Sequence, residues 1–128
     1  MSEPLWLSQA IVLAIHDEQL AAHGGLPGIR DASMLDSALG RPRNKWAYEQ
    51  GDLAALAAAY GFGIARNHPF ADGNKRTALL AIYTFLGLNG VDFAVPEADF
   101  AAVILALAAG EVSEDALAGW IRGHWHTE

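Results

Sequence analysis

The chain is organised around residues 68–88, which read His68-Pro-Phe-Ala-Asp-Gly-Asn-Lys-Arg-Thr77 and continue as an apolar run to Leu88. The part from Ala78 to Leu86 is apolar on nearly every side of a helical projection, which predicts a buried central helix. A loop that ends in a helix N-terminus offers unpaired backbone N–H groups and the positive end of the helix dipole, and both favour a bound anion. The stretch therefore predicts a phosphate-binding loop mounted on a rigid core helix.

Helical patterns flank this stretch on both sides, and strand patterns are almost absent. Capping and stop residues set the limits of each expected helix. The helices are expected over residues 8–23, 31–39, 52–67, 74–89, 96–109 and from 113 onward, with an extended segment over 91–95. Six helices with short connections and no repeat or linker predict a single all-α domain over residues 1–128.

The segment 43–51 is expected to differ from its surroundings. Gly40 and Pro42 precede it and are expected to end the second helix, because proline removes a helical hydrogen bond. The segment is polar except for Trp46 and Tyr48, and it is interpreted as an exposed flap or irregular hairpin. A tryptophan in such a segment is a candidate anchor for a partner protein.

Composition excludes several classes of protein. The 128 residues are 52% hydrophobic and have a net charge of −7, which favours a globular domain and argues against direct binding of nucleic acid. No apolar run approaches the roughly 18–20 residues of a membrane span, no basic signal sequence begins the chain, and cysteine is absent. Together these features predict a cytoplasmic protein without membrane contact. The cations gather in two groups, which favours a small phosphorylated ligand: Arg41, Arg43 and Lys45, and Arg66, Lys75 and Arg76.

The residue types within the 68–77 stretch suit phosphoryl or nucleotidyl transfer. His68 is a candidate general base for a hydroxyl proton, although a residue before proline can simply end the preceding helix. Asp72 is a candidate Mg²⁺ ligand, with a helix-capping role as the alternative. Gly73 lets the backbone approach a phosphate closely. Lys75 and Arg76 oppose the helix dipole, which indicates an anion that offsets their charge.

The remaining histidines give weaker signals. His16 and His23 lie seven residues apart on the first expected helix and are interpreted as a polar edge, with lining of a cleft as the alternative. His124 and His126 are two residues apart, a spacing that does not place both on one helix face. A metal site at the C-terminus is therefore not expected.

The stretch from His68 to Arg76 resembles the active-site motif of the Fic-fold family, and more narrowly that of the death-on-curing (Doc) toxins of bacterial toxin–antitoxin modules. The segment Gly24-Gly-Leu-Pro-Gly-Ile-Arg-Asp31, followed by Leu35 and Ala38-Leu39, is similar to the N-terminal signature of that subgroup. The resemblance covers nearly the whole chain. It implies a six-helix Fic/Doc domain, Mg-ATP as co-substrate and a protein hydroxyl as acceptor. By position, residues 43–48 match the flap that docks the target backbone in this family.

The resemblance also implies a role for each residue of the motif. His68 is implied as the general base, Asp72 as the Mg²⁺ ligand, Gly73 and Asn74 as the phosphate cradle, and Lys75 and Arg76 as the groups that neutralise transition-state charge. Such a set provides positioning and charge stabilisation, which phosphoryl transfer mostly needs.

Two positions separate this chain from the relatives that transfer AMP. Those relatives have glycine where this chain has Lys75, and a second arginine where it has Leu79. At both positions the chain matches the Doc pattern instead. Doc toxins are known as kinases that phosphorylate a threonine of elongation factor Tu, which stops translation. A lysine side chain fills space that the α-phosphate would occupy, and this favours placing the γ-phosphate at the reactive point.

The resemblance further implies a partner that regulates the site. Many Fic proteins carry an inhibitory Ser/Thr-x-x-x-Glu helix, but no Ser or Thr of this sequence has Glu four residues later. Inhibition is therefore expected from a cognate antitoxin that folds a C-terminal segment onto the toxin. The alternatives are an AMP-transferase on the same fold and a catalytically degenerate Fic-fold module that only binds protein.

Overall fold

The computed structural model describes residues 2–126, and these residues form six helices and one short two-stranded sheet. The helices are α1 (Gln9–His23), α2 (Ala32–Glu49), α3 (Leu53–Asn67), α4 (Asn74–Leu88), α5 (Glu97–Ala108) and α6 (Glu114–His124). The strands β1 (Asp92–Phe93) and β2 (Trp125–His126) pair antiparallel. The prediction of an all-α fold is confirmed. Within the described range, no helix combines the length and apolar character that crossing a membrane needs.

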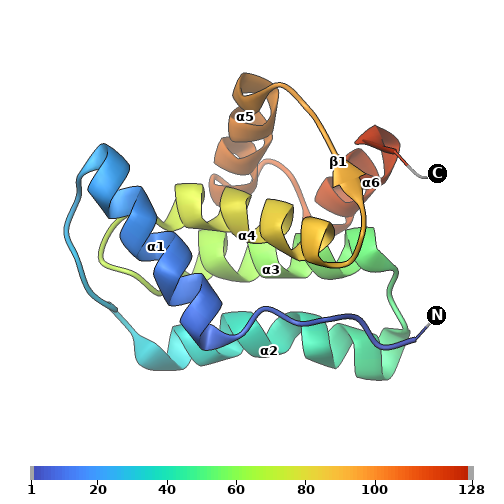
Figure 1. Ribbon diagram of the computed structural model, residues 1–128, viewed down its shortest axis with the longest axis horizontal. Coiled ribbons are helices and arrows are strands. Elements are labelled where there is room, and N and C mark those ends of the chain that lie inside the picture. Colours follow the sequence, from blue (N-terminus) through green and yellow to red (C-terminus); the bar gives the residue numbers. More distant parts are fainter. Residues whose placement is uncertain (1, 127–128) are drawn as a thin grey trace.

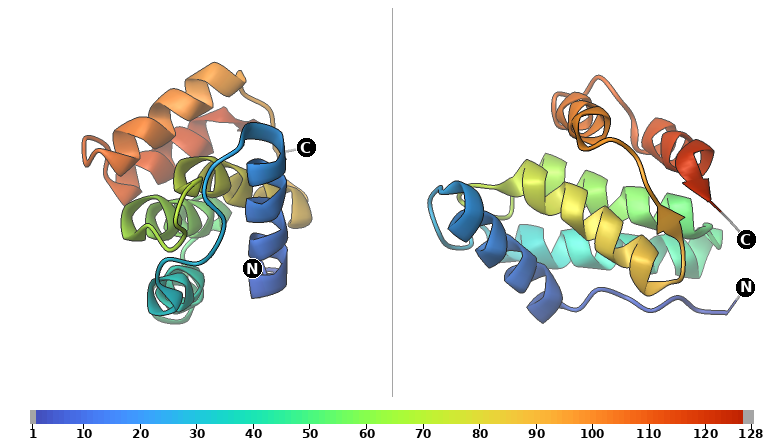
Figure 2. Two further views of the ribbon diagram at one scale, coloured as in Figure 1. Left: turned by 90° about the vertical axis from the view of Figure 1, so that its left-hand side faces the viewer. Right: turned by 45° about the horizontal axis from the view of Figure 1, so that its top comes forward.

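Helices α3 and α4 lie side by side at the centre of the bundle (Figures 1 and 2). α2 packs along α3, α1 crosses α4, and α5 and α6 cover the opposite side of the central pair (Figures 1 and 2). α3 is the most enclosed helix, with buried residues on almost every turn. α4 is buried along the face that includes Ala78, Ile82 and Phe85, while Tyr83 is half exposed. The predicted central helix is thus one of a central pair.

Side-chain caps explain where most helices begin. Ser8, Asp31, Asp52 and Ser113 each accept a backbone N–H from the first turn of the helix that follows. Each such cap satisfies at least one of the orphan N–H groups of a helix N-terminus, and Asp31 satisfies two. The predicted starts of α1, α2, α3 and α6 are therefore confirmed to within a residue.

Two glycines of α3 allow close contact with the neighbouring helices. A Cβ atom on Gly61 would lie 2.5 Å from Cδ1 of Ile82 on α4. A Cβ atom on Gly63 would lie 2.9 Å from Cα of Ala38 on α2. Glycine in a helix interior costs about 0.5–1 kcal/mol relative to alanine. Here that cost is offset by close helix packing, which a side chain at either position would prevent.

The predicted end of α2 near Leu39 is wrong, because the helix continues through Gly40 and Pro42 to Glu49. Long-range contacts favour this continuation. Pro42 is buried, so its ring adds to the core. Arg41 and Lys45, one turn apart, both reach Glu114 at the start of α6, with Nε–Oε1 and Nζ–Oε2 distances of 2.7 and 2.8 Å. The helical conformation puts residues 41 and 45 on the same face, so that both side chains reach Glu114.

The interpretation of residues 43–51 as a flap or hairpin is wrong for the same reason. Residues 43–49 belong to α2. Trp46 is partly buried against the core and does not stand out as a free anchor, whereas Tyr48 is 86% exposed. The extended segment that runs beside the 68–77 motif is instead residues 28–31, which follow α1.

Candidate active site

The loop between α3 and α4 is fixed from inside by Phe70 and Asn74. The Phe70 side chain is only 1% exposed. Oδ1 of Asn74 accepts the Phe70 N–H at 2.9 Å, and Nδ2 of Asn74 donates to the Phe70 carbonyl at 3.0 Å. The Asn74 carboxamide is therefore engaged by the loop itself. The sequence predicts Asn74 as part of a phosphate cradle. In this structure it could contribute to such a cradle only by its backbone N–H and by holding the shape of the loop.

His68 ends α3 and presents its side chain to solvent. Its backbone is left-handed, with φ 49° and ψ 57°. Arg30 holds this turn: its Nε donates to the His68 carbonyl at 2.7 Å and its Nη2 to the Asn67 carbonyl at 2.9 Å. The alternative that His68 ends the helix is thus correct structurally, and the residue remains exposed.

The segment that carries Arg30 also supports the rest of the loop. Residues 28–31 run antiparallel to residues 69–71 through a bridge between Ile29 and Phe70. The Arg30 N–H donates to the Pro69 carbonyl at 2.8 Å. The sequence 24–31 and the motif, far apart in the chain, are therefore one structural unit.

Asp72 lies exposed on the loop, close to the turn that follows α1. Its Oδ1 accepts the Gly73 N–H at 2.9 Å, and its Oδ2 accepts the Leu26 N–H at 3.3 Å. A Cβ atom on Gly25 would lie 2.9 Å from Oδ2 of Asp72, and Gly25 has φ +122°. The N-cap of α4 is Gly73, and no side chain caps that helix. The geometry therefore gives no support to the capping alternative for Asp72.

The N-terminus of α4 is open to a ligand. Among residues 2–126, no protein group accepts a hydrogen bond from the backbone N–H of Asn74, Lys75 or Arg76. Gly73 precedes them with φ +76°, a conformation that suits glycine. The Lys75 and Arg76 side chains are exposed at this positive end of the helix. Three unpaired N–H groups and two cations at one helix end are groups that favour an anion with several negative charges.

The donor set at Asp72 fits a cation that is shared with a phosphate ligand. Within the described part of the chain, no three His, Asp or Glu side chains gather in a way that could hold a metal alone. Mg²⁺ in phosphoryl-transfer sites is usually bound by one or two carboxylates, with waters and substrate phosphates as the other ligands. One exposed carboxylate beside an anion site matches that pattern.

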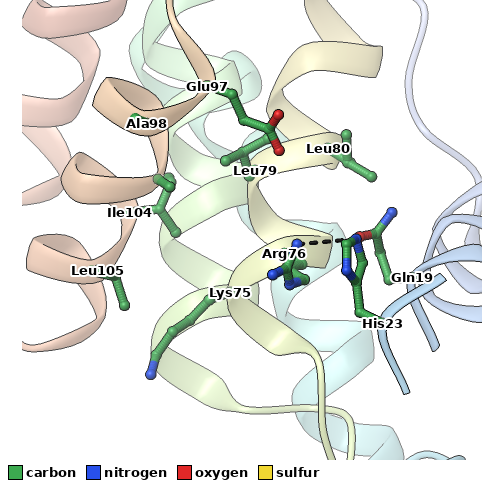
Figure 3. A pocket seen from close by; sticks show the side chains of 11 residues that line it. Gln19, His23, Lys75, Arg76, Leu79, Leu80, Glu97, Ala98, Ile104 and Leu105 are labelled. Atoms are coloured by element: carbon green, nitrogen blue, oxygen red, sulfur yellow. Dashed lines mark hydrogen bonds between the residues drawn. The ribbon is translucent and has the colours of Figure 1, made fainter. Parts of the chain in front are cut away.

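Two adjoining cavities extend from the loop along α1 and α4. The smaller, of about 430 Å³, is lined by Asp72, Gly73 and Arg76 together with residues 24–25 and the end of α1. The larger, of about 630 Å³, lies between α1, α4 and α5 and is lined by Lys75, Arg76 and several apolar side chains (Figure 3). Gln19, His23 and Arg76 line both cavities. His68 lines neither of these two cavities.

Two histidines of α1, His16 and His23, contact residues of the motif. The sequence pattern had left open whether they line a cleft. Nη1 of Arg76 donates to Nε2 of His23 at 3.1 Å (Figure 3). His16 is buried, with 2% of its surface exposed, and its Nε2 lies 2.8 Å from the Asp72 carbonyl oxygen. The interpretation of a polar edge is wrong for His16, which is buried, whereas lining of a cleft is the correct alternative for His23, which lines both cavities.

The fold and the site define a small helical protein in which a core helix begins with unpaired backbone N–H groups, Asp72 and Arg76 line one cavity at that end, and an exposed histidine ends the preceding helix. Comparison with protein-family models matches residues 6–86 to the family described as "Fic/DOC family". The chain is 38% identical over 118 residues to "Protein kinase doc" of Escherichia phage P1, an alignment covering 91% of this chain and 92% of that protein. It is 46% identical over 83 residues to "Toxin Doc" of Mycolicibacterium smegmatis (strain ATCC 700084 / mc(2)155), covering 62% and 60% of the two chains. The chain therefore belongs to the Fic/DOC family.

Proposed function

We propose that this protein is a Doc-type toxin of a toxin–antitoxin module that transfers the γ-phosphate of ATP to a threonine hydroxyl of a translation factor. The observation that carries the proposal is the open N-terminus of α4. Its N–H groups are unpaired, Arg76 lines the same cavity as Asp72, and Lys75 lines the adjoining cavity. The similarity to a phage protein named as a kinase supports phosphoryl transfer as the reaction.

The residues divide the chemistry between them. His68 accepts the proton of the acceptor hydroxyl as that oxygen forms a bond to the γ-phosphorus. The bond between the γ-phosphorus and the bridging oxygen breaks, and ADP leaves with its electron pair. The N–H groups of residues 74–76 and the Lys75 and Arg76 side chains stabilise the charge on the phosphate oxygens. Asp72 would hold Mg²⁺, which supplies further neutralisation of phosphate charge when bound.

The finer assignments rest on the resemblance and on the net charge of the chain. Elongation factor Tu is the proposed target, because Doc toxins act on a threonine of that factor. A cognate antitoxin is the proposed inhibitor, since the family pairs each toxin with one. The net charge of −7 is unsuited to a long polyanion such as RNA or DNA, so we assign no nucleic-acid substrate.

Labelled ATP separates kinase activity from the main alternative, AMP transfer. The purified protein is incubated with elongation factor Tu, Mg²⁺ and ATP labelled in either the γ- or the α-phosphate. We expect the γ-label on a threonine of the target. Transfer of the α-label would refute the kinase assignment and establish an AMP-transferase, whereas transfer of neither label to any translation factor would favour a module that only binds protein.

Lys75 variants test why the γ-phosphate is chosen. Lys75→Gly should lose kinase activity and gain slow AMP transfer, because it empties the space beside the anion site. Lys75→Ala is the matched control, since it removes the charge without adding the backbone freedom of glycine. Equal kinase activity in all three proteins would remove Lys75 from the explanation of the reaction.

A further inference from the structure

His16 connects α1 to the active-site loop through two contacts. Its imidazole stacks on the Phe70 ring, with the centroids 3.8 Å apart and the planes 9° from parallel. Its Nε2 lies 2.8 Å from the carbonyl oxygen of Asp72. A carbonyl oxygen only accepts hydrogen bonds, so Nε2 must carry the proton. The side chain is 2% exposed, and water is therefore a poor substitute for this donor.

The peptide that His16 contacts is one that local sterics leave free to rotate. It joins Asp72 to Gly73, and Gly73 has φ +76°, while glycine adopts either sign of φ with little cost. The peptide unit is planar, so fixing its carbonyl also fixes the direction of its N–H. That N–H is the one that donates to Oδ1 of Asp72 at 2.9 Å. The His16 hydrogen bond thus determines where the Asp72 carboxylate and the Gly73 backbone lie.

The turn after α1 completes the arrangement from the other side of Asp72. The Leu26 N–H donates to Oδ2 at 3.3 Å, and the missing Cβ of Gly25 leaves room for the carboxylate. Protein groups therefore orient both carboxylate oxygens of Asp72 and its backbone carbonyl oxygen. Of these contacts, only the one from His16 is made by a buried side chain.

We propose that His16 is a positioning residue, which locks the Asp72–Gly73 peptide so that the carboxylate and the phosphate-facing backbone keep one orientation. This inference rests on the proposed function for its consequence in phosphoryl transfer. The orientation of the loop by His16 is expected regardless of which group the enzyme transfers.

Three variants of His16 separate the hydrogen bond from the stacking. His16→Phe keeps an aromatic ring against Phe70 but removes the donor. His16→Gln places an amide N–H near the position of Nε2 but removes the ring. His16→Met removes both, and it replaces the Phe variant if that protein does not fold. His124→Phe is the matched control, because the His124 ring also contacts an aromatic ring, that of Trp120 at an interplanar angle of 31°, and donates from Nδ1 to the Trp120 carbonyl on α6.

The first readout is peptide-resolved amide hydrogen exchange over residues 69–76. We expect exchange of this segment to rise about tenfold in His16→Phe, in line with the loss of one buried hydrogen bond. His16→Gln should stay within about threefold of the wild type, and His124→Phe should leave the segment unchanged. The second readout is binding of Mn²⁺ in the presence of ATP, followed by electron paramagnetic resonance. The affinity should fall about tenfold in His16→Phe and be largely restored in His16→Gln.

The outcomes are decisive for His16 even where the proposed function fails. If the wild type transfers no label to any protein, the kinase proposal falls, and exchange and Mn²⁺ binding still decide the role of His16. Wild-type exchange and Mn²⁺ affinity in His16→Phe would overturn the inference. So would a His16→Gln protein as impaired as His16→Phe, because the donor would then not be the cause. If transfer is observed, we expect His16→Phe to lower kcat while leaving KM for the acceptor unchanged.

Discussion

Asn74→Ala tests whether this buried polar residue acts by holding the structure of the loop or by contacting the ligand. Its carboxamide makes two hydrogen bonds to the backbone of Phe70, at 2.9 and 3.0 Å, and both are buried. Alanine leaves one N–H and one carbonyl without a partner, and each such buried group costs about 1–3 kcal/mol. Because some water can enter the space left by the amide, we expect a loss of about 2–4 kcal/mol in the free energy of unfolding.

Asn89 provides a control with the same chemistry in a different environment. Its carboxamide also accepts a backbone N–H and donates to the carbonyl of the same residue, Leu5, at 2.8 and 2.9 Å, but these bonds are exposed. Its Nδ2 also donates to the partly buried Phe85 carbonyl at 2.9 Å, and that carbonyl keeps the Asn89 N–H as a donor when the carboxamide is removed. Water can replace an exposed partner, so Asn89→Ala should cost only about 1 kcal/mol. The burial of the Phe70 groups is the difference that the comparison isolates.

Urea unfolding followed by far-ultraviolet circular dichroism measures both variants, with the denaturant dependence checked for equality. ATP binding is measured on the same proteins below the unfolding transition. We expect Asn74→Ala to lose both stability and nucleotide affinity, and Asn89→Ala to keep nucleotide affinity. If Asn74→Ala is no less stable than Asn89→Ala, the argument from burial is wrong. A normal stability with lost ATP binding would instead mean that Asn74 contacts the ligand.

Three further predictions concern single side chains. His68→Ala should lower phosphoryl transfer by roughly 10²–10⁴-fold with little change in the urea midpoint, and full activity at equal concentration would exclude His68 as the base. Asp72→Asn should weaken the Mg²⁺ dependence of transfer at little cost in stability, whereas a loss of about 1 kcal/mol with normal transfer would restore the capping alternative. Hydrogen bonding from Arg122 lowers the pKa of Asp52 in the folded protein. The charged carboxylate therefore stabilises the fold above about pH 4, the ordinary pKa of Asp in an unfolded chain. This stabilisation is lost as the pH falls through the lower pKa of the folded state. Arg122→Gln should therefore lose less stability than the wild type between about pH 5 and 2, and parallel curves of unfolding free energy against pH would contradict this.

Local sequence was sufficient for most helices, because their signals lie within a few residues of each boundary. Ser8, Asp52 and Ser113 each cap the helix that was predicted to follow them. The apolar run after residue 77 likewise predicted a core helix, and α4 is one of the central pair. The phosphate-type site was predicted from local sequence as well, since a glycine turn, a carboxylate and two cations at a helix N-terminus form a local pattern, and it stays a prediction.

Long-range contacts decided the rest. The local signals of Gly40 and Pro42 predicted the end of α2, but Glu114, about seventy residues further along the chain, pairs with Arg41 and Lys45 and makes the helix continue. Helix propensity is a weak preference that tertiary packing overrides.

The environment of the site was decided in the same way. His16 is separated from Asp72 by 56 residues, and no spacing within α1 indicates that its ring would meet that carbonyl. The sequence by itself determined which chemical groups this protein carries and which short segments are helical. Only the tertiary structure decided which of those groups are buried, which backbone groups they hold, and hence how the Asp72 loop is oriented, because burial and hydrogen bonding across the chain depend on how the helices pack.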